Sequence, residues 1–147
     1  MRPDTPDERP VHLRWRSIGL VVLGGTIGTG LREALALTFP AAPGTLPVTI
    51  LLINLVGAFA LGLLLETLVR RGPDDGRRRD LRLLVGTGVL GGFTTYSALA
   101  VDTATLLGDA LPVGVAYAVG SVVVGSLASW AGIAVGAALH RRREAAS

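Results

Sequence analysis

The densest group of polar residues in this chain interrupts a long apolar segment and reads Gly91-Gly92-Phe93-Thr94-Thr95-Tyr96-Ser97. Two adjacent glycines and the hydroxyl residues after them disfavour an unbroken helix, and a break exposes backbone carbonyls that need a ligand or water. Freed carbonyls suit a hard monovalent cation, whereas hydroxyl and amide donors suit a small anion. A simple kink without a ligand remains the alternative.

A second polar group stands alone in apolar surroundings. Asn54 lies between Leu51-Leu52-Ile53 and Leu55-Val56, and an amide in such a segment needs a hydrogen-bond partner. The partner could be another helix, or the amide could be a donor that lines a pore. The nearby glycines, Gly57 and Gly62, are most simply explained as helix-packing positions.

Two features of the first apolar segment need separate interpretation. The glycine-rich run from Gly24 to Gly30 superficially matches a phosphate-binding loop, but no strand precedes it and no lysine follows it. The spacing of Gly24 and Gly28 instead favours close helix packing. Arg32 is either an arginine that snorkels to the interface or a positive charge at an aqueous vestibule, and its neighbour Glu33 is poorly placed to pair with it.

Four apolar blocks must position these residues. They cover residues 17–39, 48–69, 81–107 and 112–139, and each is long enough to cross a ~30 Å hydrocarbon core as a helix. The polar tails, residues 1–16 and 140–147, flank a domain spanning 17–139. The sequence therefore predicts an all-α membrane protein with four transmembrane helices, the third of them broken near its middle.

The basic residues predict the orientation of these helices. All 14 are arginine, and apart from Arg32 they lie before the first block, between the second block and the first residues of the third, or after the fourth. By the positive-inside rule both termini should be cytoplasmic, in a multi-pass protein of the cell membrane. The arginines follow no amphipathic face, so nucleic acid is not an expected partner. With its only histidines, His12 and His140, in the tails, the chain shows no catalytic cluster and is not expected to be an enzyme.

Taken together, three stretches resemble the Fluc/CrcB fluoride channels in order and spacing: the segment from Gly24 to Arg32, Ile53-Asn54-Leu55-Val56-Gly57, and the run from Gly91 to Ser97. The resemblance covers nearly the whole chain. It implies a dual-topology-type antiparallel dimer with two narrow pores, which exports fluoride passively and binds a central structural sodium ion.

The resemblance also implies roles for individual residues. The backbone carbonyls of Gly91 and Thr94 would hold the sodium ion, and Arg32 would stand near the pore entrance. The anion path would pass Asn54, Thr95, Tyr96, Ser97 and position 99. A dry, narrow path of this kind must replace the water around fluoride with amide, hydroxyl and aromatic-edge donors, and its bore would reject larger halides.

The chain departs from the family pattern at one position of this path. The family pattern continues Thr-Thr-Phe-Ser-Thr-Phe, whereas this chain has Leu99 at the second aromatic position. A leucine offers no polarised ring edge, so a pore that needs this ring should conduct poorly.

The arginine distribution raises a second question, because a protein that inserts in both orientations needs a weak charge bias. The strong bias favours a chain that is fixed with its termini inside and pairs with a related, oppositely oriented subunit. In such a heterodimer it could be the non-conducting partner or a scaffold. A homodimer, in which this chain inserts in both orientations, is the alternative. A small multidrug-type exporter is less favoured, because such a protein is expected to carry an acidic residue deep within a span. Here Glu66, Asp102 and Asp109 all fall near predicted span ends.

Overall fold

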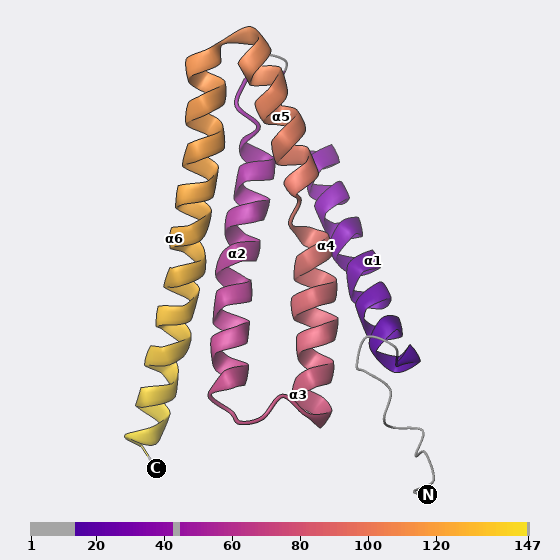
Figure 1. Cartoon of the computed structure of the whole chain (residues 1–147), viewed down its shortest axis with the longest axis vertical. Coiled ribbons are helices and arrows are strands. Elements are labelled where there is room, and N and C mark those ends of the chain that lie inside the picture. The colour runs from indigo at the N-terminus through magenta and orange to yellow at the C-terminus, as the bar shows by residue number, and fades with distance from the viewer. Residues whose placement is uncertain (1–13, 43–44, 147) are drawn as a thin grey trace, which may run out of the picture.

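The computed structural model describes residues 14–42 and 45–146, and this part of the chain contains helices and connecting loops without any strand. Four helical rods run side by side, with α2 between α6 and the third rod, and α1 on the far side of that rod (Figure 1). In chain order the elements are α1 (Trp15–Thr38), α2 (Val48–Val69), α3 (Gly76–Leu81), η2 (Arg82–Leu90), α4 (Gly91–Phe93), α5 (Tyr96–Asp109) and α6 (Leu111–Glu144).

Four candidate membrane spans are confirmed in the described part of the chain: Trp15–Thr38, Val48–Val69, Gly76–Asp109 and Leu111–Glu144. The second span matches its predicted limits. The third begins earlier than the predicted residue 81, and the fourth continues beyond residue 139, because both helices extend through arginine-rich ends. Arginine is a good helix former, and cations in the last turn of α6 interact favourably with the helix dipole.

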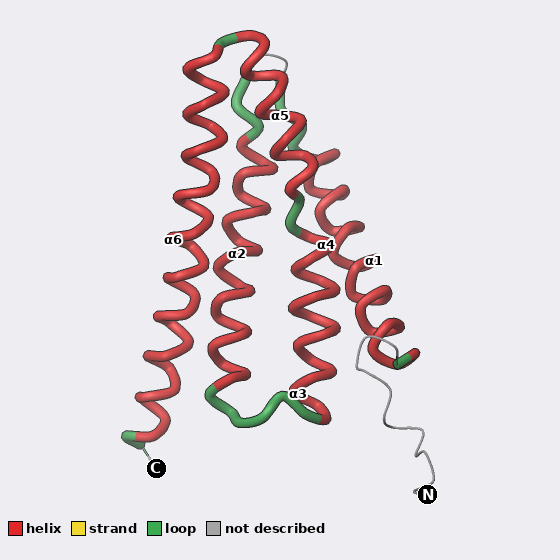
Figure 2. The backbone as a smooth tube through the Cα atoms, in the orientation of Figure 1, coloured by secondary structure: helices red, strands yellow, loops and turns green. Residues whose placement is uncertain are grey.

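The third rod is broken at the predicted place. It starts as α3, widens into the π-helix η2, tightens again in α4 and then stops at Thr94 and Thr95, whose backbones are extended (φ −76° and ψ 155°, φ −148° and ψ 119°). Figure 2 shows this interruption as a short loop between two helical segments. The last regular bond before it runs from the Thr94 N–H to the Leu90 carbonyl at 3.0 Å.

Glycines determine how closely α1 approaches η2. Gly24 and Gly28 are buried, and a Cβ at either position would overlap a backbone carbonyl, that of Leu84 or Val89. A Cβ at Gly88, on the η2 side, would lie 2.8 Å from the Gly24 Cα. The packing interpretation of Gly24 and Gly28 is therefore confirmed, and backbone-to-backbone contact replaces side-chain interdigitation here.

Glycines also allow the backbones of α2 and α6 to approach each other closely. A Cβ at Gly62 would overlap the Ser129 carbonyl, and one at Gly132 would overlap the Phe59 carbonyl. Gly57 lies on α2 where a Cβ would collide with the Thr94 methyl group at the break of the third rod. Gly57 and Gly62 are thus both packing positions, as predicted, and α2 contacts both of its neighbours through them.

Few large side chains are buried in the described part of the chain. The buried apolar residues are Ile53, Leu68, Leu83, Leu106 and Tyr117. Many leucines, isoleucines and valines on every rod are exposed instead, which a water-soluble domain of this size could not sustain. This outer surface is suited to contact with lipid tails or with another membrane subunit.

We expect Gly28→Ala to destabilise the α1–η2 contact, because its methyl group would meet the Val89 carbonyl and lie 2.8 Å from the Phe93 nitrogen. Overpacking of this kind costs about 1–3 kcal/mol. Gly30→Ala is the matched control, since a Cβ at Gly30 meets nothing within 4 Å. Thermal unfolding of the purified chain in detergent measures the difference, and equal unfolding temperatures for the two variants would contradict this packing account.

Candidate functional site

The side chain of Asn54 is tied to the break in the third rod. Its Nδ2 donates to the Thr95 carbonyl at 3.0 Å, and its Oδ1 accepts from the Thr95 N–H at 2.8 Å. The amide therefore pairs with both backbone polar groups of one extended residue, as a neighbouring strand would. Of the two sequence-based alternatives for Asn54, the interhelical hydrogen bond is the one this geometry displays, and one N–H of Nδ2 is still available to another acceptor.

Thr95 begins the second half of the broken rod. Its side chain is buried, with 6% exposed, and its Oγ1 caps α5 by accepting from the Ala98 N–H at 3.2 Å. The same Oγ1 lies 3.1 Å from the Ser97 Oγ, within hydrogen-bond distance. The backbone N–H and carbonyl of Thr95 thus bond Asn54, and its hydroxyl bonds the first turn of α5.

These two residues remove the helical donors from two particular carbonyls. In an unbroken α-helix the Thr95 N–H would donate to the Gly91 carbonyl, but here it donates to Asn54. The Ala98 N–H would donate to the Thr94 carbonyl, but here it donates to the Thr95 hydroxyl. The carbonyls of Gly91 and Thr94 are therefore among those that the break deprives of their α-helical donors, and the resemblance implies that these two would hold sodium.

The chemistry of this pair fits a hard monovalent cation. Carbonyl oxygens without N–H donors can replace part of an ion's hydration shell, and the exposed position of Gly91 leaves it accessible from outside the chain. Among the described residues no group of three or more histidines, aspartates and glutamates could hold a metal ion, so a metal here would depend on backbone oxygens. Two carbonyls are too few for a complete coordination shell, which would need oxygens from a second source.

Two of the remaining residues of the predicted anion path, Tyr96 and Ser97, lie on the outside of the chain. Tyr96 is 82% exposed, Ser97 is exposed, and Leu99 is half-buried further along α5. Asn54 and Thr95 face inward and bond each other. The single chain therefore does not enclose a path along these residues, and any such path would run along its surface.

Arg32 is half-buried on α1, and within the described ranges it makes no hydrogen bond or ion pair, including none with Glu33. The expectation that Glu33 is a poor partner is thus confirmed. Near the same end of the structure an apolar hollow of about 450 Å³ opens between α1, α2 and the break. It is lined by Leu35, Phe39, Thr49, Leu52, Ile53, Val56 and Phe93.

The structure adds a polar cluster that the sequence analysis did not identify. Asp102 on α5 faces Tyr117 on α6, one helical turn from Ser121. Asp102 Oδ2, Tyr117 Oη and Ser121 Oγ are buried without a hydrogen-bond partner in the described chain. The sequence predicts a span end near Asp102, but α5 continues seven residues past it. The spacing of Tyr117 and Ser121, four residues apart on one helix face, was the available signal.

Buried polar atoms without partners are costly in lipid and are retained where they line a path or bind a ligand. Four apolar helices long enough to cross a membrane, the third of them interrupted, are typical of a multi-pass membrane protein. Within this class the chain belongs to the CrcB family, described as CrcB-like protein, Camphor Resistance (CrcB), whose pattern matches residues 19–133.

Curated relatives agree with this assignment over most of the chain. A protein of Leifsonia xyli subsp. xyli named "Fluoride-specific ion channel FluC 2" is 52% identical over 135 residues, covering 91% of this chain and 92% of the relative. The "Fluoride-specific ion channel FluC 1" of Cutibacterium acnes is 47% identical, covering 91% of both chains. A third relative, from Mesorhizobium japonicum, is 43% identical over 122 residues. The predicted family membership is therefore confirmed.

We expect Asn54→Leu to loosen the break, because it leaves the Thr95 N–H without its partner and removes the Asn54 donor from the Thr95 carbonyl. An unsatisfied buried polar group costs about 1–3 kcal/mol. Amide hydrogen exchange in the Thr95–Leu99 segment should accelerate, and thermal stability in detergent should fall. Thr67→Val is the control on the same helix, since its hydroxyl bonds only the Leu63 carbonyl one turn away. Unchanged exchange at the break in Asn54→Leu would contradict the anchoring role of Asn54.

Proposed function

We propose that this chain is a subunit of a fluoride-selective channel, which lowers cytoplasmic fluoride by passive export. The observation that carries the proposal is the interrupted third rod held open by Asn54, found in a chain that belongs to this family. The names of its relatives supply the ion.

Fluoride is small and strongly hydrated, so a path through lipid must offer donors in place of water. Ser97 and the ring of Tyr96, whose edge is positive, are exposed on α5, and Asn54, which bonds the adjacent Thr95, keeps a second N–H on Nδ2. The unpartnered hydroxyls of Tyr117 and Ser121 can donate further along α6. Asp102 would repel an anion when ionised, and the single hydrogen of the Tyr117 hydroxyl can then be donated either to the Asp102 carboxylate or to the anion.

The path requires a second subunit, because Tyr96 and Ser97 lie on the surface of the single chain. We propose an antiparallel dimer in which each subunit supplies one wall of two pores. Arg32, unpaired among the described residues, would draw anions towards an entrance. The arginine-rich ends would lie in the cytoplasm with both termini, so an oppositely oriented partner is either a related chain or a minority population of this one.

Sodium would act as a structural ion at the centre of this dimer. The Gly91 and Thr94 carbonyls of each chain have lost their helical donors, and the two chains together can offer two pairs of oxygens. When bound, such an ion supplies positive charge that offsets the repulsion between carbonyl dipoles brought together. The residues that set the geometry are Asn54 and Thr95, which hold the break open.

A non-conducting partner subunit is the second candidate, and Leu99 is the observation that favours it. The family's second ring is missing at this half-buried position of α5. In a heterodimer, the complete pore of the related subunit could then carry the flux.

Fluoride efflux from liposomes tests the proposal, first with this chain alone and then with its nearest co-encoded relative, using chloride as the control ion. Fluoride-selective efflux from the chain alone would establish a conducting homodimer. Efflux only in the presence of the relative would support the heterodimer. If neither preparation shows fluoride efflux, with folding verified by size-exclusion chromatography, the channel function is overturned for this chain.

We expect Leu99→Phe to raise fluoride efflux, since it restores a ring edge to the path. If the contact is worth as much as one between two aromatic rings, about 0.5–1.5 kcal/mol, the rate should change about 2- to 13-fold. Leu111→Phe, at an exposed position where α6 begins, controls for the added ring itself. If both variants change efflux equally, position 99 does not border the path.

Replacing sodium with N-methyl-D-glucamine should weaken association of the dimer and reduce efflux together, because the four carbonyls would then repel one another. Purified protein can be followed by size-exclusion chromatography and by efflux in matched buffers. Potassium at the same ionic strength controls for salt. Association and efflux that are unchanged without sodium would remove the structural ion from the proposal while leaving the channel intact.

A further inference from the structure

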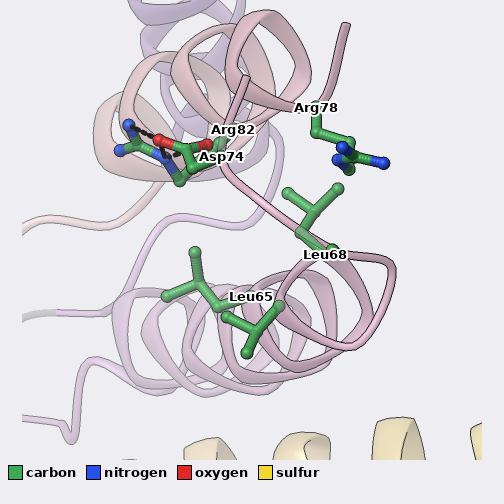
Figure 3. A pocket seen from close by; sticks show the side chains of 7 residues that line it. Leu65, Leu68, Asp74, Arg78 and Arg82 are labelled. Atoms are coloured by element: carbon green, nitrogen blue, oxygen red, sulfur yellow. Dashed lines mark hydrogen bonds and ion pairs between the residues drawn. The ribbon is translucent and has the colours of Figure 1, made fainter. Parts of the chain in front are cut away.

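The connection between α2 and η2 folds over a hollow at the arginine-rich end of the structure. The hollow has a volume of about 220 Å³ and is lined by Leu65, Leu68, Val69, Gly72, Asp74, Arg78 and Arg82. Figure 3 shows leucine side chains from α2 on one side of it and the charged side chains of the connection above them. An apolar wall and a charged rim therefore meet at the boundary of the membrane span.

The apolar wall is the last part of α2. Leu68 is 7% exposed and forms the base, whereas Leu65 and Val69 are 37% and 74% exposed and continue onto the outer surface of the helix. Since α2 is a candidate membrane span that ends at Val69, this wall lies at the edge of the hydrocarbon region. A hydrocarbon chain lying along α2 could reach the hollow without leaving apolar surroundings.

Arg78 is the fixed cation of the rim. Its guanidinium donates to the Pro73 carbonyl at 2.7 Å, the Arg71 carbonyl at 3.0 Å and the Asp75 carboxylate at 2.9 Å. These bonds use three of the five N–H groups of an arginine, so two remain for another acceptor. The guanidinium is held in place by the loop before any ligand arrives, which reduces the entropy lost on binding.

Arg82 stands with Asp74 on the opposite side of the hollow from Arg78 in the view of Figure 3. Its Nε and Nη2 donate to both carboxylate oxygens of Asp74, at distances from 2.7 to 3.1 Å. The hydrogen bond from Arg82 lowers the pKa of the Asp74 carboxyl, so Asp74 stays ionised at neutral pH and offsets the Arg82 charge. Arg78 is paired in turn with Asp75, which does not line the hollow, so the lining residues Asp74, Arg78 and Arg82 together carry one net positive charge. Arg82 Nη1 makes no bond to the described residues.

We propose that this hollow binds an anionic phospholipid from the leaflet on the side of the chain termini. The phosphate would accept from Arg78 and from Arg82 Nη1, while an acyl chain lies along Leu65, Leu68 and Val69. Inorganic phosphate shares the headgroup chemistry but would gain nothing from the apolar wall, which is why the lipid is the occupant. This site is separate from the proposed pore, and it holds whether or not the chain conducts fluoride.

Native mass spectrometry of the full chain in detergent tests the site by titration with phosphatidylglycerol and, in parallel, with phosphatidylcholine. We expect phosphatidylglycerol to bind more tightly, and Arg78→Gln to weaken it about fivefold, from the charge effect of one arginine near a membrane surface. Arg77→Gln is the matched control, because it removes the same charge from an exposed position of α3 that does not line the hollow. Equal losses in the two variants would overturn the site in favour of a diffuse charge effect.

Val69→Trp provides a second test that leaves every charge in place, and so does not depend on how the loop tolerates Arg78→Gln. Its ring should occupy the apolar part of the hollow and weaken phosphatidylglycerol binding, while thermal unfolding verifies that the protein is folded. Inorganic phosphate at a concentration matched to the lipid should not displace the lipid. Full displacement by phosphate, or binding unaffected by Val69→Trp, would mean a simple anion site and would overturn the lipid proposal.

Discussion

The pairing of the Asn54 amide with the peptide groups of Thr95 is the interaction on which the polar part of this structure depends. A helix interrupted within a membrane leaves N–H and carbonyl groups that lipid cannot satisfy, at a cost of several kcal/mol each. Asn54 supplies one donor and one acceptor where the chain is fully extended. With the Thr95 hydroxyl as the cap of α5, the interruption becomes a stable feature that releases only selected carbonyls.

The rest of the chain brings Asn54 and Thr95 into register. In lipid, apolar side chains gain little by burial against each other, so the rods must meet through close van der Waals contact. Gly57 permits α2 to approach Thr94 directly, and Gly24 and Gly28 bring α1 onto the π-helical half of the third rod. Because the rods pack through glycines, most large apolar side chains lie on the outside. The exposed residues of the break also lie on this outer surface, where a second subunit can reach them.

Different residues were predictable to different degrees. The interruption at Gly91–Ser97 and the packing glycines were evident because glycine pairs and small-residue spacings have direct backbone consequences. Asp102 and Tyr117 were not linked, since they belong to different helices and no local spacing relates them. Arg78 likewise resembled any member of a charged loop, although its three bonds to the connection make it a fixed side of a hollow.

The sequence by itself determined that the chain lies in a membrane, how many spans it has, where the third span breaks and to which family it belongs. These follow from the lengths of the apolar segments, the glycine pairs and the distribution of charge, which are local properties of the chain. Only the tertiary structure decided which partner satisfies Asn54, which carbonyls lose their donors, and which polar atoms of α5 and α6 face each other without a bond. The physical reason is that hydrogen bonds between helices depend on rotation and depth to within a fraction of a helical turn. Hydropathy and spacing limit these quantities, but only the packing of the rods specifies them.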